Sequence, residues 1–251
     1  MTNREPRTAH ADAPLAQLLR SRPGYVPPTV GERVVVVADL LAPSRHPRAV
    51  MNLLRFVGDW QPDRVVVMSA RQHGSTHKGS ECATSTLARL RAVYSGDIVI
   101  QAGAGAGRDA LTVGSCSCWH PVISDLGLAV TAGIHPVAPG WLSLSATGPG
   151  VSRYPGALAI LLARGFGHSI ICSGTSGLAL IGEIPTGDST ADTLWGFEIG
   201  TLRCTAPSTA SSFRPAMGFG VVDSTTGIAE PTAVAISRSG AFTFDGVTYA
   251  A

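Results

Sequence analysis

The sequence predicts an α/β protein, and three observations lead to that class. Continuous runs of β-branched residues at 34–37 and 65–67 are typical of strands that are buried on both faces. Between these runs, apolar residues recur on one helical stripe, at Val50, Leu53, Leu54, Val57 and Trp60. From Thr193 onward the pattern changes to short strands only. The first three elements therefore form a βαβ unit, for which we expect a right-handed crossover.

The remaining elements follow from local signals along the chain. The first helix is expected to begin at His46-Pro47, because proline suits the first helical turn, and to end at Gln61-Pro62. A polar, glycine-containing loop over 71–85 is expected, followed by a second helix around 84–94. Further predicted elements are strands at 98–100, 128–132, 141–144 and 170–172, a helix at 155–164, and a hairpin turning at Asp245-Gly246.

The predicted domain organisation is an arm followed by one domain. Residues 1–32 are rich in proline and polar residues, with a short helical patch near Leu15–Leu19, and we interpret them as an N-terminal arm. Residues 33–251 are interpreted as the folded domain. No apolar run approaches the roughly 18 residues of a membrane span, and the first residues lack the apolar core of a signal peptide. We therefore expect a protein made in the cytoplasm.

Composition points away from some partners and towards others. Charged residues make up 14% of the chain, whereas about 25% is usual. Two interpretations stay open: a coding bias, since Lys78 is the only lysine, or a surface that is buried in an assembly. The net charge of +2 without a basic block argues against a nucleic-acid surface. The five cysteines have irregular spacing, so we interpret them as small buried or half-buried thiols rather than as metal ligands.

Several stretches carry a family resemblance. They are HPRAVMNLLRFVGDWQPDRVVV, VAPGW, SRYPGALAILLARGFGHSII, TLWGFEIG and FTFDGVTY. In this order they resemble the calcineurin-like metallophosphoesterases, most closely versions encoded by bacteriophages of actinobacteria. The resemblance implies a sandwich of two β-sheets flanked by helices. In that family two metal ions over the strand ends activate a bridging water, which attacks a phosphoester.

The family's metal-ligand motifs can be placed on this sequence. Asp-x-His falls on residues 39–41, Gly-Asp on 69–70, Gly-Asn-His-acid on 103–106, a later histidine near 145, and Gly-His-x-His on 173–176. The ligand positions implied by the resemblance are Asp39, Leu41, Ala70, Ala104, Gly105, Ser145, Gly174 and Ser176. Of these, Asp39 alone keeps the family's ligand type. A lone carboxylate binds a hard divalent ion weakly and cannot hold two ions in register. The expected protein is thus a pseudoenzyme with no catalytic residue, metal or cofactor.

Two alternatives remain open. His73 and His77 are four residues apart and could join Asp39 in a rebuilt site of an active metal-dependent phosphoesterase, although Gly74 and Gly79 favour a solvated loop there. The emptied cleft could also hold an anion. Its backbone N–H groups would come from Gly103, Gly105, Gly174, Thr175 and Ser176.

The function expected from this resemblance and from the composition is structural. We expect an assembly or binding role with protein partners, in an oligomer or larger assembly such as a phage capsid. One such role is that of a minor capsid or decoration component of a virion. The chain would then be made in the host cytoplasm and carried in the virion.

Overall fold

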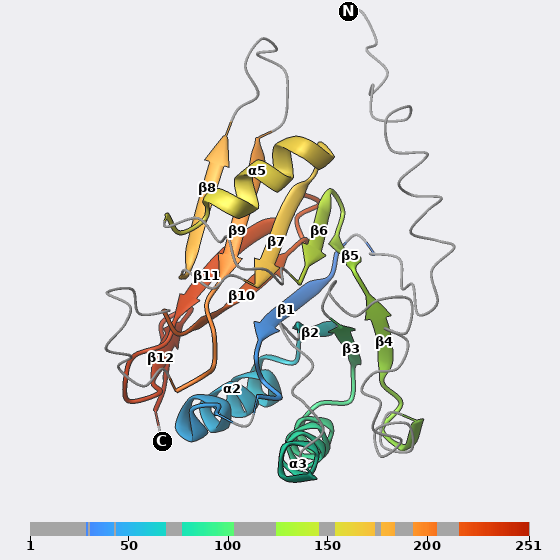
Figure 1. Cartoon of the computed structure of the whole chain (residues 1–251), viewed down its shortest axis with the longest axis vertical. Coiled ribbons are helices and arrows are strands. Elements are labelled where there is room, and N and C mark those ends of the chain that lie inside the picture. Colours follow the sequence, from blue (N-terminus) through green and yellow to red (C-terminus); the bar gives the residue numbers. More distant parts are fainter. Residues whose placement is uncertain are drawn as a thin grey trace, which may run out of the picture.

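A computed structural model describes residues 29, 31–42, 44–68, 77–102, 124–145, 154–173, 177–183, 193–204 and 216–250. Two large β-sheets pack face to face, with α2 and α3 on the outside of one sheet and α5 on the outside of the other (Figure 1). The predicted α/β sandwich of two sheets flanked by helices is therefore confirmed. Residues 1–28 of the predicted arm lie outside the described residues, so the boundary at residue 32 stays a prediction.

The first sheet combines parallel strands with an antiparallel pair at one side. Its order is β11 (Glu230–Ala235), β10 (Gly218–Asp223), β1 (Arg33–Ala38), β2 (Arg64–Met68), β3 (Asp97–Ala102) and β4 (Ala129–Ala132). The strands β1 to β4 are parallel to one another, whereas β10 runs antiparallel to both β1 and β11. All five residues of β2 are buried, as its β-branched run predicts.

The second sheet has the order β5 (Ile134–Ala138), β6 (Trp141–Leu144), β7 (Ser169–Ser173), β9 (Leu194–Ile199) and β8 (Ala179–Glu183). The strands β6, β7 and β9 are parallel, while β5 and β8 run antiparallel at the two edges. Gly133 alone separates β4 from β5, so the chain passes directly from one sheet to the other. The predicted hairpin forms from β12 (Phe242–Phe244) and β13 (Val247–Tyr249), with Asp245 and Gly246 both at positive φ.

The helices lie close to the predicted positions, with informative differences. The helix α2 (Pro47–Trp60) begins as expected, and the His46 side chain accepts a hydrogen bond from the backbone N–H of Ala49. The helix α3 (His77–Val93) begins seven residues before its predicted start at residue 84, so the predicted loop is wrong from residue 77 onward. One glycine in a helix costs only about 1 kcal/mol, and packing of Leu87 and Leu90 in the core offsets it.

The helix α5 (Ala157–Phe166) also extends past its predicted end at Arg164. Gly165 is accommodated within the helix, and Gly167 ends it in the left-handed conformation. The backbone of α5 approaches β9 very closely, because a Cβ at Gly196 would overlap the backbone of Ile160. This contact places α5 directly over β9.

Three apolar layers hold these elements together. One lies between the first sheet, α2, α3 and the C-terminal hairpin, with Phe56 and Phe219 at its centre. The second lies between the two sheets, and the third lies under α5. Cys172 is buried in the third layer, as predicted for the cysteines. Cys204 is exposed, so the prediction of a buried or half-buried thiol is wrong for that residue. Among the described residues no helix is long and apolar enough to span a membrane.

Candidate functional site at the strand ends

The carboxyl ends of parallel strands from both sheets meet at one edge of the sandwich. Asp39 directly follows β1 and contacts Thr201, which follows β9 in the other sheet. Gln101, near the end of β3, contacts Ser143 of β6 across the sandwich. Ligand sites of α/β proteins commonly lie outside the carboxyl ends of strands. This edge is therefore the candidate site. Of the site positions predicted from the sequence, the structure describes Asp39, Leu41 and Ser145, which follow strands that end at this edge.

Asp39 occupies a tight turn between β1 and α2. Its φ of 58° lies in the left-handed region, which aspartate tolerates better than most residues. Its backbone N–H donates to the carbonyl of Met68 at 3.1 Å, so the turn is tied to the end of β2. Leu40 is buried, and the half-buried Leu41 packs against the core under α2. The predicted ligand position 41 thus holds a side chain that serves the apolar core.

Both carboxylate oxygens of Asp39 already have partners. The Thr201 hydroxyl donates to Oδ2 at 2.7 Å, and Nη2 of Arg203 lies 3.2 Å from Oδ1. The Arg203 backbone N–H in turn donates to the Thr201 hydroxyl at 3.1 Å. The side chain of Asp39 is 12% exposed and that of Arg203 is 30% exposed, so the ion pair is only partly screened by water. A guanidinium group therefore supplies the positive charge beside this carboxylate.

Backbone contacts hold the segment that carries Thr201 and Arg203 against the start of α2. The His46 N–H donates to the carbonyl of Leu202 at 2.7 Å, and the Cys204 N–H donates to the carbonyl of Ser44 at 2.6 Å. Arg45 and Arg203 form an isolated antiparallel bridge between the two segments. Residues 201–204 are thus positioned by several hydrogen bonds that do not involve Asp39.

Ser145 lies at the end of β6, where the resemblance places a later ligand. Its side chain is buried, and its Oγ is 3.4 Å from the Oγ of Ser173 at the end of β7. Two neutral hydroxyl groups offer weak ligands to a divalent ion, which prefers carboxylate or imidazole groups. Within the described ranges no group of three or more histidine, cysteine, aspartate or glutamate side chains could hold a metal ion.

Most other predicted site residues lie outside the described residues. These are Ala70, Gly103, Ala104, Gly105, Gly174, Thr175 and Ser176, together with His73 of the rebuilt-site alternative. His77 lies in the first turn of α3, and its side chain is not among those described. The anion-binding and rebuilt-site interpretations therefore stay predictions.

A buried polar cluster joins the two sheets next to this edge. The Ser143 Oγ lies 2.7 Å from Oε1 of Gln101, while Nε2 of Gln101 donates to the carbonyls of Ser143 and Gly133. The neighbouring His135 is fully buried, and in the part of the chain described here neither ring nitrogen has a hydrogen-bond partner. Burial, followed by the nearby positive charge of Arg64, lowers the pKa of His135 to about 4.

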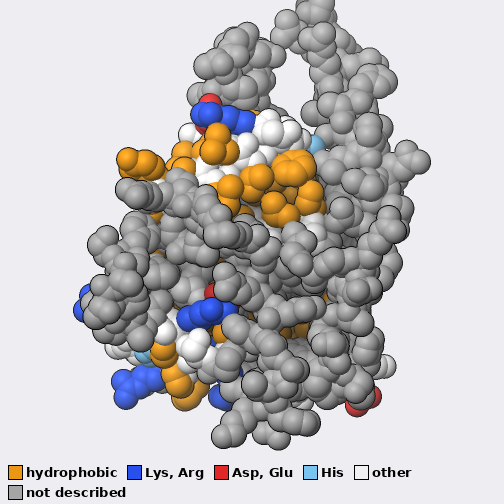
Figure 2. All heavy atoms as spheres, viewed as in Figure 1, with side chains coloured by type: hydrophobic (Ala, Val, Ile, Leu, Met, Phe, Trp, Pro, Cys, Tyr) orange, Lys and Arg blue, Asp and Glu red, His pale blue; other side chains and the backbone are white. Residues whose placement is uncertain are grey.

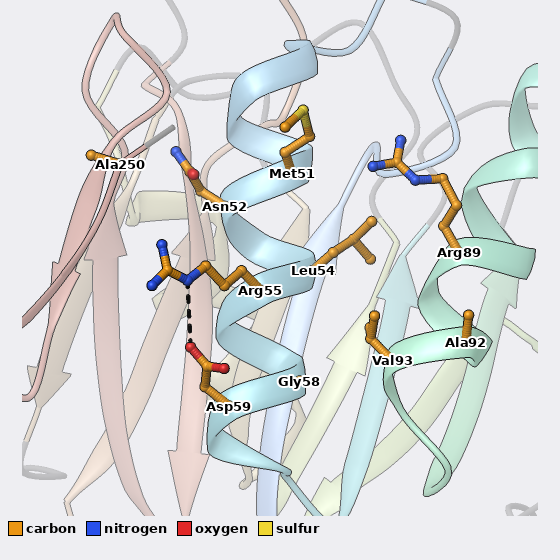
Figure 3. Close-up of a pocket in the computed structure, with 10 residues that line it drawn as sticks. All are labelled: Met51, Asn52, Leu54, Arg55, Gly58, Asp59, Arg89, Ala92, Val93 and Ala250. Atoms are coloured by element: carbon orange, nitrogen blue, oxygen red, sulfur yellow. Dashed lines mark ion pairs between the residues drawn. The ribbon is translucent and has the colours of Figure 1, made fainter.

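A separate surface groove lies between α2 and α3 (Figure 3). It has a volume of about 720 Å³, and its lining includes Met51, Leu54, Arg89 and Val93. An exposed ion pair of Arg55 with Asp59, 3.7 Å apart, lies along it. None of the residues around Asp39 lines this groove, so it is not part of the candidate site.

Sequence reasoning found Asp39 but missed Thr201 and Arg203. Thr201 is 162 positions from Asp39, and no local pattern marks either partner. The contact exists only because β1 and β9 lie in sheets that pack face to face.

Comparisons with known proteins add a limited finding. No family model matches the chain, and no curated protein does. Among solved structures, the chain is similar to Vps29 of Chaetomium thermophilum, with a TM-score of 0.47 and 12% identity over 87% of this chain and 98% of that chain. It is also similar to TT1561 of Thermus thermophilus, with a TM-score of 0.44 and 9% identity over 81% and 99% of the two chains. For the nuclease MPE of Pseudomonas putida the values are 0.38, 12%, 79% and 87%. Similarities of this size say nothing of activity.

Proposed function

We propose that this chain is a catalytically inactive, metallophosphoesterase-like protein with a structural, assembly or binding role. The observation that carries the proposal is the state of the Asp39 carboxylate, which Thr201 and Arg203 already bind. A divalent ion would have to displace Arg203 or lie beside its positive charge. Displacing Arg203 would break its ion pair with Asp39. An ion beside Arg203 would be repelled, because like charges repel strongly where water screens them poorly.

The neighbouring positions support the same conclusion. Leu41 is committed to the apolar core, and Ser145 faces another serine hydroxyl. Two metal ions that activate a bridging water lie about 3.5–4 Å apart, and several carboxylate or imidazole ligands are needed to hold them there. The described residues contain no group of three or more such side chains, and the Asp39 carboxylate is already in an ion pair.

The decisive test is the metal content of the purified protein after incubation with excess Mn²⁺ or Zn²⁺ and desalting. We expect essentially no retained metal in the wild-type protein. We also expect none in Arg203→Met, because removing the guanidinium does not restore the missing ligands. Two ions per chain, with metal-dependent hydrolysis of a phosphodiester that Asp39→Ala abolishes, would instead establish the active phosphoesterase with a rebuilt site.

For the retained role we propose a component of a larger protein assembly, such as a minor capsid or decoration protein of a phage virion. The charge-poor sequence and its resemblance to phage-encoded chains support this role. Mass spectrometry of purified particles is the direct test. Absence of the chain from the particles would contradict the virion role and leave the inactivity of the site unaffected.

A further inference from the structure

The described residues include four edge strands in the two large sheets, and three of these carry features that discourage pairing. The strand β11 contains Pro231, and β5 contains Pro136 with a register shift between Pro136 and Ala138. The strand β4 is only four residues long. Proline, bulges and short length protect an edge, because its free N–H and C=O groups would otherwise pair with another chain. The fourth edge strand, β8, has none of these features.

Among the described residues, no strand pairs with the outer edge of β8. On its inner side the strand pairs with β9 in a regular antiparallel register from Ala179 to Glu183. On its outer side it makes no hydrogen bond to any residue that the structure describes. Its single charge, on Glu183, is bound by Arg164 of α5, with 2.6 Å between Nη2 and Oε2. The edge is thus an apolar strand without a free charge, which is a template for strand addition.

The helix beside this edge has an apolar outer face. Arg164 is the only charged residue among the ten of α5. On its outer side Leu161 is 58% exposed and Phe166 is 36% exposed. A helix that is apolar on all sides is normally buried, whereas α2 shows the usual polar outer face with Arg55 and Asp59. Figure 2 shows hydrophobic side chains gathered where α5 and β8 lie in Figure 1.

We propose that β8 pairs antiparallel with β8 of a second copy of this chain, joining the two five-stranded sheets into one. An antiparallel edge is complementary to itself about a two-fold axis. Centred on Ile181, the pairing places Glu183 of one copy opposite Ala179 of the other, so like charges do not meet. The net charge of +2 opposes association only weakly. The charge pattern of the edge therefore fits a second copy.

The helices contribute side chains rather than backbone contacts to this interface. Because α5 lies over β9, three strand spacings, or about 14 Å, separate the two α5 axes, against 8–10 Å for directly packed helices. The exposed Leu161 of each copy and the half-buried Ile181 fill the space between them. Such an interface is small for a stable complex, so we expect a dimer that dissociates on dilution. This inference rests on the proposed assembly role and supplies a contact surface for it. In a large assembly, many weak contacts together give tight binding.

The test is sedimentation velocity of the full chain over a range of concentrations. We expect a concentration-dependent dimer for the wild-type protein and at least about tenfold weaker association for Leu161→Lys, which brings two charges together across the axis. Ile228→Lys is the matched control, because Ile228 is another large apolar residue and is 73% exposed. It is expected to associate like the wild type. Hydrogen exchange should show that those amides of 179–183 that point away from β9 are slowed at high concentration only.

Three outcomes would overturn this inference. One is a monomer at every concentration. Another is a dimer that Leu161→Lys leaves intact and in which the outward-pointing amides of β8 exchange freely. The third is slow β8 exchange that appears only when a different protein is added, which would make the partner heterologous. None of these outcomes bears on metal binding, so the proposed inactivity would stand. Conversely, two bound ions would overturn the inactivity and leave this interface in place.

Discussion

Replacing Arg203 by methionine is expected to lower the free energy of unfolding by about 2 kcal/mol, because it leaves a mostly buried carboxylate with one neutral hydrogen-bond donor. Asp39 would keep the Thr201 hydroxyl at 2.7 Å but lose the guanidinium at 3.2 Å. Methionine keeps an aliphatic side chain of similar length, so the loss of charge dominates the change. Urea denaturation followed by circular dichroism measures the effect.

A double-mutant cycle with Asp39→Asn isolates the ion pair. Asparagine tolerates the positive φ of 58° and keeps an oxygen that accepts from Thr201, but it carries no charge. We expect the double variant to be more stable than the sum of the two single effects predicts, by about 1 kcal/mol or more.

Arg55→Met is the matched control, since the Arg55–Asp59 pair has side chains 66% and 56% exposed. Its expected effect is below about 0.5 kcal/mol. Equal effects of Arg203→Met and Arg55→Met would show that Arg203 does not stabilise the Asp39 carboxylate.

Acidification from pH 6.5 to about 4 is expected to destabilise the fold through His135 by up to about 3 kcal/mol. The folded-state pKa of about 4 lies below the ordinary value of 6.5, so the fold holds the imidazole neutral. Below pH 6.5 His135 binds a proton in the unfolded chain but not in the folded chain. The free energy of unfolding therefore falls with pH until His135 is also protonated in the folded state, near pH 4. Above pH 6.5 neither state binds this proton, and the dependence disappears.

His135→Leu is the variant that identifies the source of this dependence. Leucine fills similar space without polar nitrogens, which have no partner among the described residues. Carboxylates titrate in both proteins, so the quantity to measure is the difference in unfolding free energy between wild type and variant at each pH. We expect this difference to change by about 3 kcal/mol between pH 7 and pH 4. A difference that stays constant with pH would show that His135 is not held neutral in the fold.

Local patterns predicted the elements that carry a strong local signal. The strands β1 and β2, the start of α2 at Pro47 and the hairpin turn at Asp245 all follow from side-chain spacing or turn chemistry. The predicted start of α3 was wrong, because tertiary packing of Leu87 and Leu90 outweighs the free-energy cost of placing Gly79 in a helix. The strand β5 was missed, because one glycine separates it from β4 and no turn signal marks the change of sheet.

The sequence by itself determined which groups are available at the strand ends. It showed that position 39 holds an aspartate while positions 41 and 145 hold leucine and serine, and residue identity limits coordination chemistry whatever the fold. Only the tertiary structure decided what Asp39 does. Its partners Thr201 and Arg203 are more than 160 positions away, and they reach it because β1 and β9 end at the same edge of two packed sheets. The position of β8 at the edge of its sheet is likewise a product of strand order, which local spacing does not encode.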